Sequence, residues 1–279
     1  MTSRRAALAE GVALLEASGV PGAARDARLL YRWASGLEGV ALTAALNETA
    51  GPEELARFRE ALAARSKRRP VSQIIGVREF WGRRFEITPD VLDPRPESET
   101  LIAVALRERA ARVLDLGTGS GCLMLTLLAE WLTATGLGVD LSPAALAVAA
   151  RNAESLSLAP RAEFRRSDWF GAVEGRFDLI VANPPYLTEA ELADAPPELR
   201  HEPAGALSDG GDGLGAYRAI LAGAAAHLAS GGRMLLEIGA TQSRDVIALA
   251  QSHGWTGLYC LPDLDGRDRV VQCRWETKS

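Results

Sequence analysis

The chain has 279 residues, of which 47% are hydrophobic and 24% are charged, an ordinary balance for a soluble globular protein. Its formal net charge of −5 argues against a dedicated binder of duplex DNA, because such proteins are more often basic. No apolar stretch approaches the roughly 18–20 residues of a membrane span, and the N-terminus lacks the apolar core of a signal peptide, so we expect a cytoplasmic protein without membrane association.

Residues 1–70 are predicted to form a small helical domain. Two segments carry apolar residues at helical spacing, and Pro21-Gly22 separates them. A further helix begins at Gly51-Pro52, which two acidic residues follow. The basic run Arg65–Arg69 is interpreted as the solvated end of that helix. The apolar positions of the first two segments are Leu8, Val12, Leu15, Leu29, Leu30 and Trp33.

Residues 71–92 are predicted to be a β-hairpin linker, because the apolar runs 74–77 and 85–87 flank Trp81-Gly82. The prolines of Pro94-Arg95-Pro96 then impose an extended loop, and a helix is expected to begin near Ser98. This loop opens the third region, residues 93–279.

The third region alternates short apolar runs with helical segments. This alternation predicts an α/β fold with a doubly wound, mostly parallel, seven-stranded sheet. One helix is expected from Leu214 to Leu228, ending before Gly231-Gly232. The expected strands are 112–116, 137–140, 162–165, 177–182, 234–238, 258–261 and 270–275; the other expected helices are 122–131, one that Ser142-Pro143 begins, and 244–253.

The tetrapeptide Asn183-Pro184-Pro185-Tyr186 directly follows the strand 177–182. Its prolines cannot donate to a sheet ladder, so they form a stiff corner at the strand end, where open α/β sheets bind ligands. Asn183 and the Pro184 carbonyl offer two acceptors, and Tyr186 adds an aromatic face. This set suits a planar –NH₂ group, either a carboxamide or the exocyclic amine of a base.

A glycine loop, Gly117-Thr118-Gly119-Ser120-Gly121, follows the strand 112–116. Its glycines permit a tight turn and the close approach of a ligand. The spacing departs from the dinucleotide fingerprint, so we expect a compact, less anionic ligand. Asp140 ends the next strand about 20 residues later, where a carboxylate can accept hydrogen bonds from both ribose hydroxyls; capping of the following helix is the alternative.

Asp168-Trp169 follows the strand 162–165 and could place a carboxylate and an aromatic face beside an adenine ring; a structural role for Trp169 is the alternative. An adenosine-bearing cofactor beside an –NH₂ site suggests methyl transfer from S-adenosyl-L-methionine. Orientation of the nitrogen can supply up to about 7–11 kcal/mol of the barrier reduction.

No metal site is expected, because His201, His227 and His253 lack ligand spacing. Cys122, Cys260 and Cys273 form no C-x-x-C pair and are interpreted as small core residues.

These motifs together resemble the S-adenosylmethionine-dependent methyltransferases with an NPPY motif. Three further segments narrow the resemblance to the release-factor glutamine N5-methyltransferases, the HemK/PrmC family. Ser98 stands where that family has Thr or Asp. The segments are Arg78–Gly82, Pro94–Glu97 and Glu202–Leu214, the last with Glu202-Pro203, Ala206-Leu207 and Gly210–Leu214.

The resemblance implies methylation of the glutamine in the Gly-Gly-Gln loop of class I peptide-chain release factors. Gly117–Gly121, Asp140, Asp168, Trp169 and Asn183 would then bind the cofactor. Asn183, Pro184, Pro185 and Tyr186 would bind the glutamine amide, with Asn183, Pro184 and Tyr186 as the catalytic set. The helical domain would dock the release factor.

Two alternatives keep the chemistry and change the substrate. An adenine N6-methyltransferase acting on DNA or RNA would place a flipped base in the same site, but the acidic chain argues against stable nucleic-acid binding. A glutamine methyltransferase of a ribosomal protein would share the NPPY motif. A non-catalytic adaptor would not need the glycine loop, Asp140 and Asn183–Tyr186 together.

Overall fold

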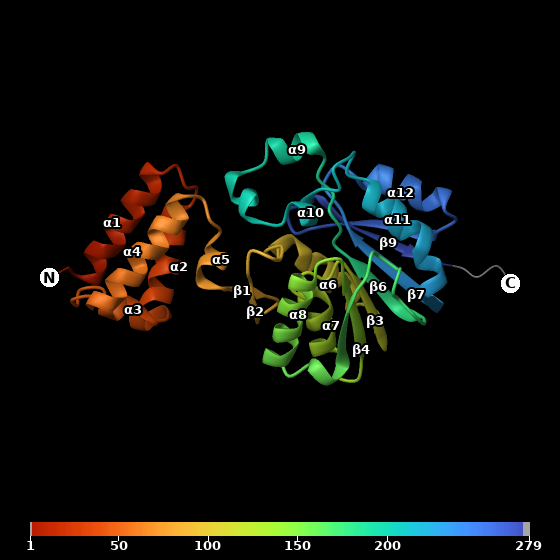
Figure 1. Ribbon diagram of the computed structural model, residues 1–279, viewed down its shortest axis with the longest axis horizontal. Helices are drawn as coiled ribbons and strands as arrows, with labels where there is room; N and C mark the ends of the chain where they lie inside the picture. Colours follow the sequence, from red (N-terminus) through yellow and green to blue (C-terminus); the bar gives the residue numbers. More distant parts are fainter. Residues whose placement is uncertain (1, 276–279) are drawn as a thin grey trace. The chain divides into compact units, whose positions relative to one another are not determined.

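The computed structural model describes residues 2–275; Met1 and residues 276–279, at the ends of the first and last predicted regions, lie outside the described residues. The chain divides into two compact units. The helical unit combines the residues up to Val77 with Pro196–His201, and the sheet unit combines Arg78–Ala195 with the residues from Glu202 onward (Figure 1).

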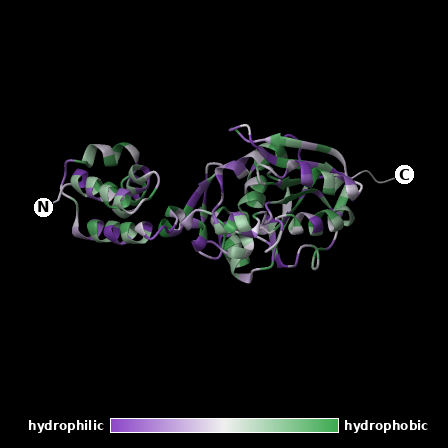
Figure 2. Cartoon of the chain, turned by 90° about the horizontal axis from the view of Figure 1, so that it is seen from above, coloured by the Kyte–Doolittle hydropathy of each residue, from purple (hydrophilic) through white to green (hydrophobic). Residues whose placement is uncertain are grey.

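The predicted helical region is confirmed. Its helices pack around Leu15, Leu30, Tyr31 and Phe58. Figure 2 shows that each of these helices carries both hydrophobic and hydrophilic residues. A Cβ atom on Gly11 would lie 2.6 Å from the Phe58 ring, so glycine permits close approach there. The helices are α1 (Arg4–Ala17), α2 (Ala23–Ser35), α3 (Gly39–Ala45), α4 (Pro52–Ser66) and α5 (Val71–Ile75).

The apolar face of α2 differs from the prediction at Trp33. The buried residues of α2 are Ala23, Ala27, Leu30, Tyr31 and Ala34. Trp33 is 42% exposed, because the face of α2 that packs against α1 and α4 is formed by the alanines together with Leu30 and Tyr31, and Trp33 lies off this face.

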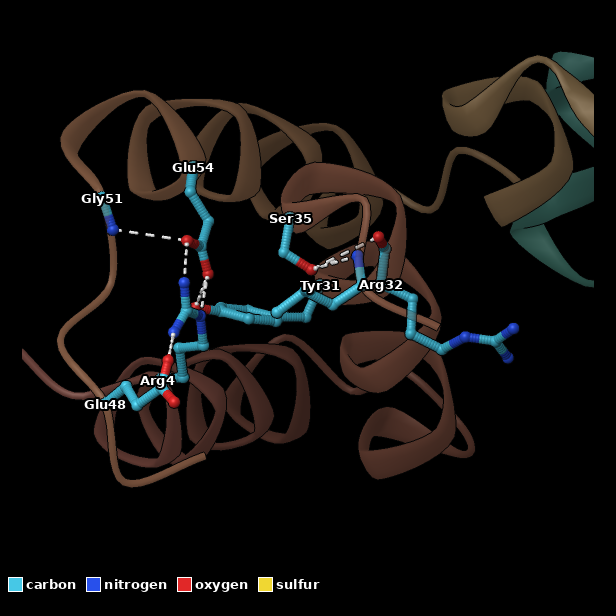
Figure 3. Close-up of polar contacts among 8 residues, drawn as sticks. Arg4, Tyr31, Arg32, Ser35, Glu48, Gly51 and Glu54 are labelled. Atoms are coloured by element: carbon cyan, nitrogen blue, oxygen red, sulfur yellow. Dashed lines mark hydrogen bonds and ion pairs between the residues drawn. The ribbon is translucent and has the colours of Figure 1, made fainter. Parts of the chain in front are cut away.

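A polar network is buried within the helical unit, at Glu54 (Figure 3). Arg4 donates from Nε and Nη2 to the two carboxylate oxygens of Glu54, at 2.9 and 3.1 Å. The Tyr31 hydroxyl and the Gly51 N–H also donate to this carboxylate. These bonds hold the pKa of Glu54 below its usual value despite burial, so the carboxylate stays charged and joins α1, α2 and α4.

The basic run at the end of α4 is not solvated as predicted. Arg65 is only 5% exposed and donates to Asp26 at 2.8 Å and to Glu198 at 2.9 Å. Arg68 donates to Glu198 at 2.9 Å, and Gln73 donates to the His201 carbonyl at 2.8 Å. The segment Pro196–His201, which forms the 3₁₀ turn η3 (Pro197–His201), is therefore bound to the helical unit by ionic and hydrogen bonds.

The predicted hairpin is present as β1 (Val77–Phe80) and β2 (Arg83–Glu86). Trp81 and Gly82 both have positive φ angles, +50° and +67°, as a tight two-residue hairpin turn requires. The prediction was wrong for residues 74–75, which belong to α5. Pro70 precedes this helix and Gly76, with a φ of +75°, ends it.

The sheet unit contains the predicted seven-stranded, mostly parallel sheet, in the order β5-β4-β3-β6-β7-β9-β8. The pairs among the first five strands in this order are parallel, and β9 is antiparallel to both β7 and β8. The strands are β3 (Arg112–Leu116), β4 (Thr135–Asp140), β5 (Ala162–Arg166), β6 (Phe177–Ala182), β7 (Leu228–Glu237), β8 (Thr256–Pro262) and β9 (Asp268–Arg274).

Helices cover both faces of this sheet, as Figure 1 shows. Leu179 and Val181 of β6 belong to one hydrophobic core and Ile180 to the other, because successive strand side chains point to opposite faces. The first core includes residues of α6 (Glu99–Ala105), which the 3₁₀ turn η1 (Pro96–Ser98) precedes, of α7 (Cys122–Glu130) and of α8 (Pro143–Ser155). The second core includes residues of α11 (Gly215–Gly223) and α12 (Ser243–Ser252).

The helix predicted from Leu214 to Leu228 is shorter than expected. The α-helix ends at Gly223, a 3₁₀ turn η4 (Ala224–His227) follows, and β7 already begins at Leu228. Gly231, with a φ of +76°, lies in an irregularity where the pairing with β6 shifts, so the two glycines mark a bulge within a strand. Other short helical turns that were not predicted include η2 (Ala159–Arg161), α9 (Glu189–Ala193) and α10 (Ala204–Leu207).

Within residues 2–275, no helix combines the length and apolar character needed to cross a membrane.

Replacement of Glu54 by Gln should destabilise the helical unit by about 3 kcal/mol, because the partly buried Arg4 guanidinium would lose its buried carboxylate partner and keep only the exposed Glu48. Urea unfolding of the full chain, with hydrogen exchange of the α1 amides, measures the effect. Glu53→Gln, at the exposed position next in sequence, is the matched control and should change stability little. Equal stability of the two variants would contradict the structural role of this network.

Candidate active site

A cavity of about 470 Å³ lies within the sheet unit, where β3, β4 and β6 end. Its volume is in the range of small-molecule sites. Three predicted site residues, Gly121, Pro184 and Tyr186, are not among its lining residues. The predicted residues that do line it are Gly117, Thr118, Gly119, Ser120, Asp140, Asp168, Trp169, Asn183 and Pro185.

The glycine loop is held against the end of β4. The N–H groups of Gly117 and Thr118 both donate to the Val139 carbonyl, each at 2.9 Å. The Thr118 hydroxyl donates to the Asp115 carboxyl at 2.7 Å. Gly117 and Gly119 have φ angles of +69° and +54°, which L side chains rarely adopt. The tight turn therefore depends on glycine at these two positions.

Both carboxylate oxygens of Asp140 accept backbone hydrogen bonds. Oδ2 accepts from the Gly119 N–H and Oδ1 from the Ser142 N–H, each at 2.9 Å. Ser142, rather than Asp140, is the N-cap of α8, since its hydroxyl accepts from Ala145 N. Each Asp140 oxygen retains acceptor capacity, so this carboxylate, at the cavity wall, can still accept hydrogen bonds from ligand hydroxyls.

Trp169 has an unusual backbone conformation for a bulky residue, with a φ of +44°. Ser167 stabilises it: the Ser167 hydroxyl donates to the Trp169 carbonyl at 2.8 Å and accepts from Ala172 N at 2.9 Å. Strained backbone of this kind concentrates at binding sites, and the Trp169 side chain lines the cavity beside Asp168.

The Asn183 side chain is oriented by Ser98. Asn183 Nδ2 donates to the Ser98 hydroxyl at 3.4 Å, which leaves the amide oxygen Oδ1 available as an acceptor. Pro184 is buried and Pro185 lines the cavity. The Tyr186 side chain is half-buried, and burial raises its pKa to about 12, so the phenol is protonated at neutral pH.

Gly121 has a packing role. Its φ is +79°, and a Cβ atom there would lie 3.0 Å from Leu125 Cδ1 and 3.3 Å from Ala149 Cβ. Gly121 therefore lets α7 begin close to α8, while Gly117–Ser120 line the cavity.

The lining also includes residues that were not predicted as site residues. Two segments that are distant in sequence, one at residues 93–95 and one at Glu202, are joined at the edge of the cavity. Glu202 accepts a hydrogen bond from Arg95 at 2.6 Å and from the Asp93 N–H at 3.3 Å. The Pro94–Glu97 and Glu202-Pro203 motifs were the only signal for these walls in the sequence. The additional lining residues are Asp90, Val91, Leu92, Pro94, Ser98, Cys122, Leu123, Val139, Leu141, Ser142, Ala145, Ser167, Pro203, Gly205 and Ala206.

The three cysteines were predicted to be core residues, and this holds only for Cys273. Cys122 borders the cavity and is half-buried, and Cys260 is half-buried elsewhere in the sheet unit. No cluster of three or more His, Cys, Asp or Glu side chains suited to a metal ion occurs within residues 2–275.

Two buried carboxyl groups lie beside the site. Burial raises the pKa of Asp115, at the base of the glycine loop, to about 7. Burial also raises the pKa of Glu237, at the end of β7, to about 7, although the Ser98 hydroxyl and Arg269 oppose the shift. Neither residue lines the cavity, but each contacts a residue that does: Asp115 contacts Thr118 and Glu237 contacts Ser98.

Solved structures confirm the fold, and a domain family indicates the class of protein. The chain aligns with a methyltransferase from Pyrococcus furiosus at 18% identity and a TM-score of 0.54, covering 70% of this chain and 89% of that one. It aligns with the catalytic domain of human Mettl16 at 15% identity and a TM-score of 0.57, covering 79% and 83%. Residues 96–215 match the methyltransferase small domain. The protein is an S-adenosylmethionine-dependent methyltransferase.

Sequence relatives identify the family. Residues 6–76 match the PrmC N-terminal domain. The release factor glutamine methyltransferase of Cereibacter sphaeroides is 57% identical over 96% of this chain and 97% of the relative. That of Rhodospirillum rubrum is 43% identical over 96% of this chain and 83% of the relative. The chain belongs to the release factor glutamine methyltransferase family, which confirms the resemblance inferred from its motifs.

Replacement of Ser167 by Ala should weaken S-adenosylmethionine binding about tenfold. The change removes two hydrogen bonds that hold Trp169 in its left-handed conformation, and each such bond contributes about 1 kcal/mol. Calorimetric titration with the cofactor measures the change. Ser157→Ala, at an exposed position away from the cavity, is the control. Unchanged affinity in Ser167→Ala would show that this conformation does not serve the cofactor.

Replacement of Glu237 by Gln should stabilise the protein more at pH 8 than at pH 5. The folded-state pKa of about 7 lies above the ordinary glutamate value of 4.5, so folding favours the protonated carboxyl. Its contribution to stability is full below about pH 4.5 and is lost as the pH rises toward 7. Thermal midpoints at the two pH values test this, with the exposed Glu174→Gln as control. An equal shift at both pH values would contradict the raised pKa.

Proposed function

We propose that this chain transfers a methyl group from S-adenosylmethionine to the side-chain amide nitrogen of the glutamine in the Gly-Gly-Gln motif of class I peptide-chain release factors. One observation carries the proposal: Gly117–Ser120 of the glycine loop, Asp140, Asn183 and Pro185 all border one cavity. The relatives that bear the name of this reaction cover almost the whole chain, including its helical region.

The cofactor half of the cavity fits S-adenosylmethionine in its donor and acceptor groups. Asp140 would accept hydrogen bonds from the ribose hydroxyls, and Trp169 would offer an aromatic face to the adenine ring. Gly117–Ser120 would admit the cofactor close to the backbone. The bound cofactor supplies a methyl group that is already activated by its positively charged sulfur.

The acceptor half of the cavity would activate the amide. A glutamine amide nitrogen is a weak nucleophile because its lone pair is delocalised into the carbonyl. Asn183 Oδ1 and the Pro184 carbonyl would accept hydrogen bonds from this –NH₂ group and stabilise the positive charge that develops on nitrogen. The proline-stiffened corner would hold the nitrogen in line with the methyl group, and orientation of this kind can contribute about 7–11 kcal/mol.

Proton loss would follow methyl transfer. Neither His nor Lys occurs among the described residues that line the cavity. Once the N–CH₃ bond has formed, the nitrogen carries a positive charge and is strongly acidic, so its proton can pass to water. The site would therefore work through position and dipoles, without a side chain that acts as a strong base.

We further propose that residues 1–70 dock the release factor, that residues 71–92 link them to the catalytic region 93–279, and that the enzyme acts in the cytoplasm without stable nucleic-acid binding or a metal. The net charge of −5 supports a protein substrate over a polyanionic one.

The assay that tests the function uses the purified chain with S-adenosylmethionine labelled in its methyl group. The label should enter a class I release factor at the Gly-Gly-Gln glutamine, and a release factor with that glutamine replaced by Ala should stay unlabelled. Duplex DNA, RNA and ribosomal proteins are offered in parallel. Label in any of these, or in the Gln→Ala release factor, would overturn the substrate assignment.

Asn183→Ala should lower kcat at least a hundredfold while the affinity for S-adenosylmethionine changes much less, because the lost acceptor acts on the amide in the transition state. Asp140→Ala is the matched contrast and should weaken cofactor binding more than Asn183→Ala does. Steady-state kinetics and cofactor titration separate the two effects. A variant of Asn183 that lost only cofactor affinity would contradict its role at the amide.

A further inference from the structure

We infer that Gln242 and Gly213 are positioning residues that fix the backbone of Tyr186, and with it the amide-binding corner. This inference rests on the proposed role of Asn183–Tyr186 in binding the acceptor –NH₂ group. Neither Gln242 nor Gly213 lines the cavity, so both must act through the motif that they contact.

The Gln242 side chain uses every hydrogen-bonding position of its amide. Nε2 donates to the Tyr186 carbonyl at 3.0 Å and to the Gly213 carbonyl at 3.2 Å. Oε1 accepts from the Gly239 N–H at 3.0 Å and lies 3.5 Å from the Tyr217 hydroxyl, whose single proton it shares with a backbone carbonyl. A rotated amide would set its oxygen against two carbonyl oxygens, so these four partners determine its orientation.

The partners of Oε1 are themselves tied to the sheet. The Tyr217 hydroxyl directs its proton mainly to the nearer acceptor, the Glu237 carbonyl at 2.9 Å, at the last residue of β7, and Tyr217 is fully buried. Gly239 lies two residues beyond the same strand. Gln242 therefore transmits the position of the end of β7 to the backbone of Tyr186.

Gly213 encloses the Tyr186 carbonyl from another direction. A Cβ atom on Gly213 would lie 2.4 Å from the Tyr186 carbonyl oxygen and 3.0 Å from Gln242 Nε2. The φ of Gly213 is +73°, so glycine is required both by the backbone and by the space. This contact gives the Gly210–Leu214 segment, noted in the sequence without a role, a physical function.

The tetrapeptide is thus fixed at both ends. At its start, β6 pairs with β7 up to Ala182, which lies opposite Leu236. At its end, Gln242 and Gly213 hold the Tyr186 carbonyl. Two rigid prolines lie between these points, so a shift of Tyr186 would move Pro185 and the Pro184 carbonyl. A displacement near 1 Å can lower a rate about a hundredfold.

Gln242→Glu tests the contact with almost no change in shape. The variant keeps an acceptor for Gly239 N and Tyr217, but at pH 8 or above it sets a carboxylate oxygen against the Tyr186 and Gly213 carbonyls. We expect kcat for the release factor to fall at least tenfold, while the Kd for S-adenosylmethionine stays within twofold. A purely structural role would instead lower the thermal midpoint and weaken both ligands together.

Gly213→Ala should give the same kinetic defect by steric displacement of Tyr186. Gly210→Ala is its matched control, because Gly210 has nearly the same φ, +76°, but a Cβ atom there meets nothing closer than Glu189 Oε1 at 4.0 Å. The two variants carry similar backbone strain, but only the new Cβ atom at position 213 would clash with the Tyr186 carbonyl oxygen. Gly210→Ala should retain kcat within about threefold of the wild type.

The outcomes separate this inference from the proposed function. If the wild type methylates the release factor and both Gln242→Glu and Gly213→Ala match its kcat, the positioning role is wrong and the function stands. It is also wrong if Gly210→Ala is as defective as Gly213→Ala. If the wild type labels a different acceptor, the function is wrong, and the same ratios measured with that acceptor still decide the positioning role.

Discussion

The reversal of strand order beside β3 is the constraint on which the site depends. β3 pairs with β4 on one side and with β6 on the other, and Leu116 lies opposite both Val139 and Ala182. The next residues along the three strands therefore emerge at one level: the first glycine of the loop, the Asp140 carboxylate and the Asn183 amide. A slip of one residue in either pairing would shift Asn183 or Asp140 out of level with the glycine loop.

Polar contacts, more than apolar packing, set the walls around this point. The Arg95–Glu202 ion pair joins two cavity segments that lie far apart in the chain, and Gln242 holds the end of the proline corner. Buried polar groups are costly when a partner is missing, so each such contact favours one arrangement over looser alternatives. The raised pKa of Glu237 shows that the surroundings do not fully compensate every buried charge.

Secondary structure could be predicted from the sequence where the local hydrophobic pattern agrees with the burial of the residues in the folded protein. The strand Phe177–Ala182 was predicted with its observed bounds, since an apolar run with β-branched residues and a proline stop leaves little choice. Residues Ala224–His227 continued an apolar helical pattern, but the chain leaves the α-helix at Gly223 to begin β7. The burial of Arg65 and the hydrogen bond between Ser98 and Asn183 could not be predicted, because the partner residues, Glu198 and Asn183, are distant in sequence.

The helical unit is not encoded by one continuous stretch of the gene. Glu198, from the middle of the chain, receives Arg65 and Arg68 and so completes a unit that otherwise precedes Arg78. Exchange of this unit between relatives by recombination at a single junction would separate these charges and leave the nearly inaccessible Arg65 with fewer carboxylates. Evolution of the helical unit is thus coupled to that of Pro196–His201, and a chimaera would have to exchange both segments together to preserve these ion pairs.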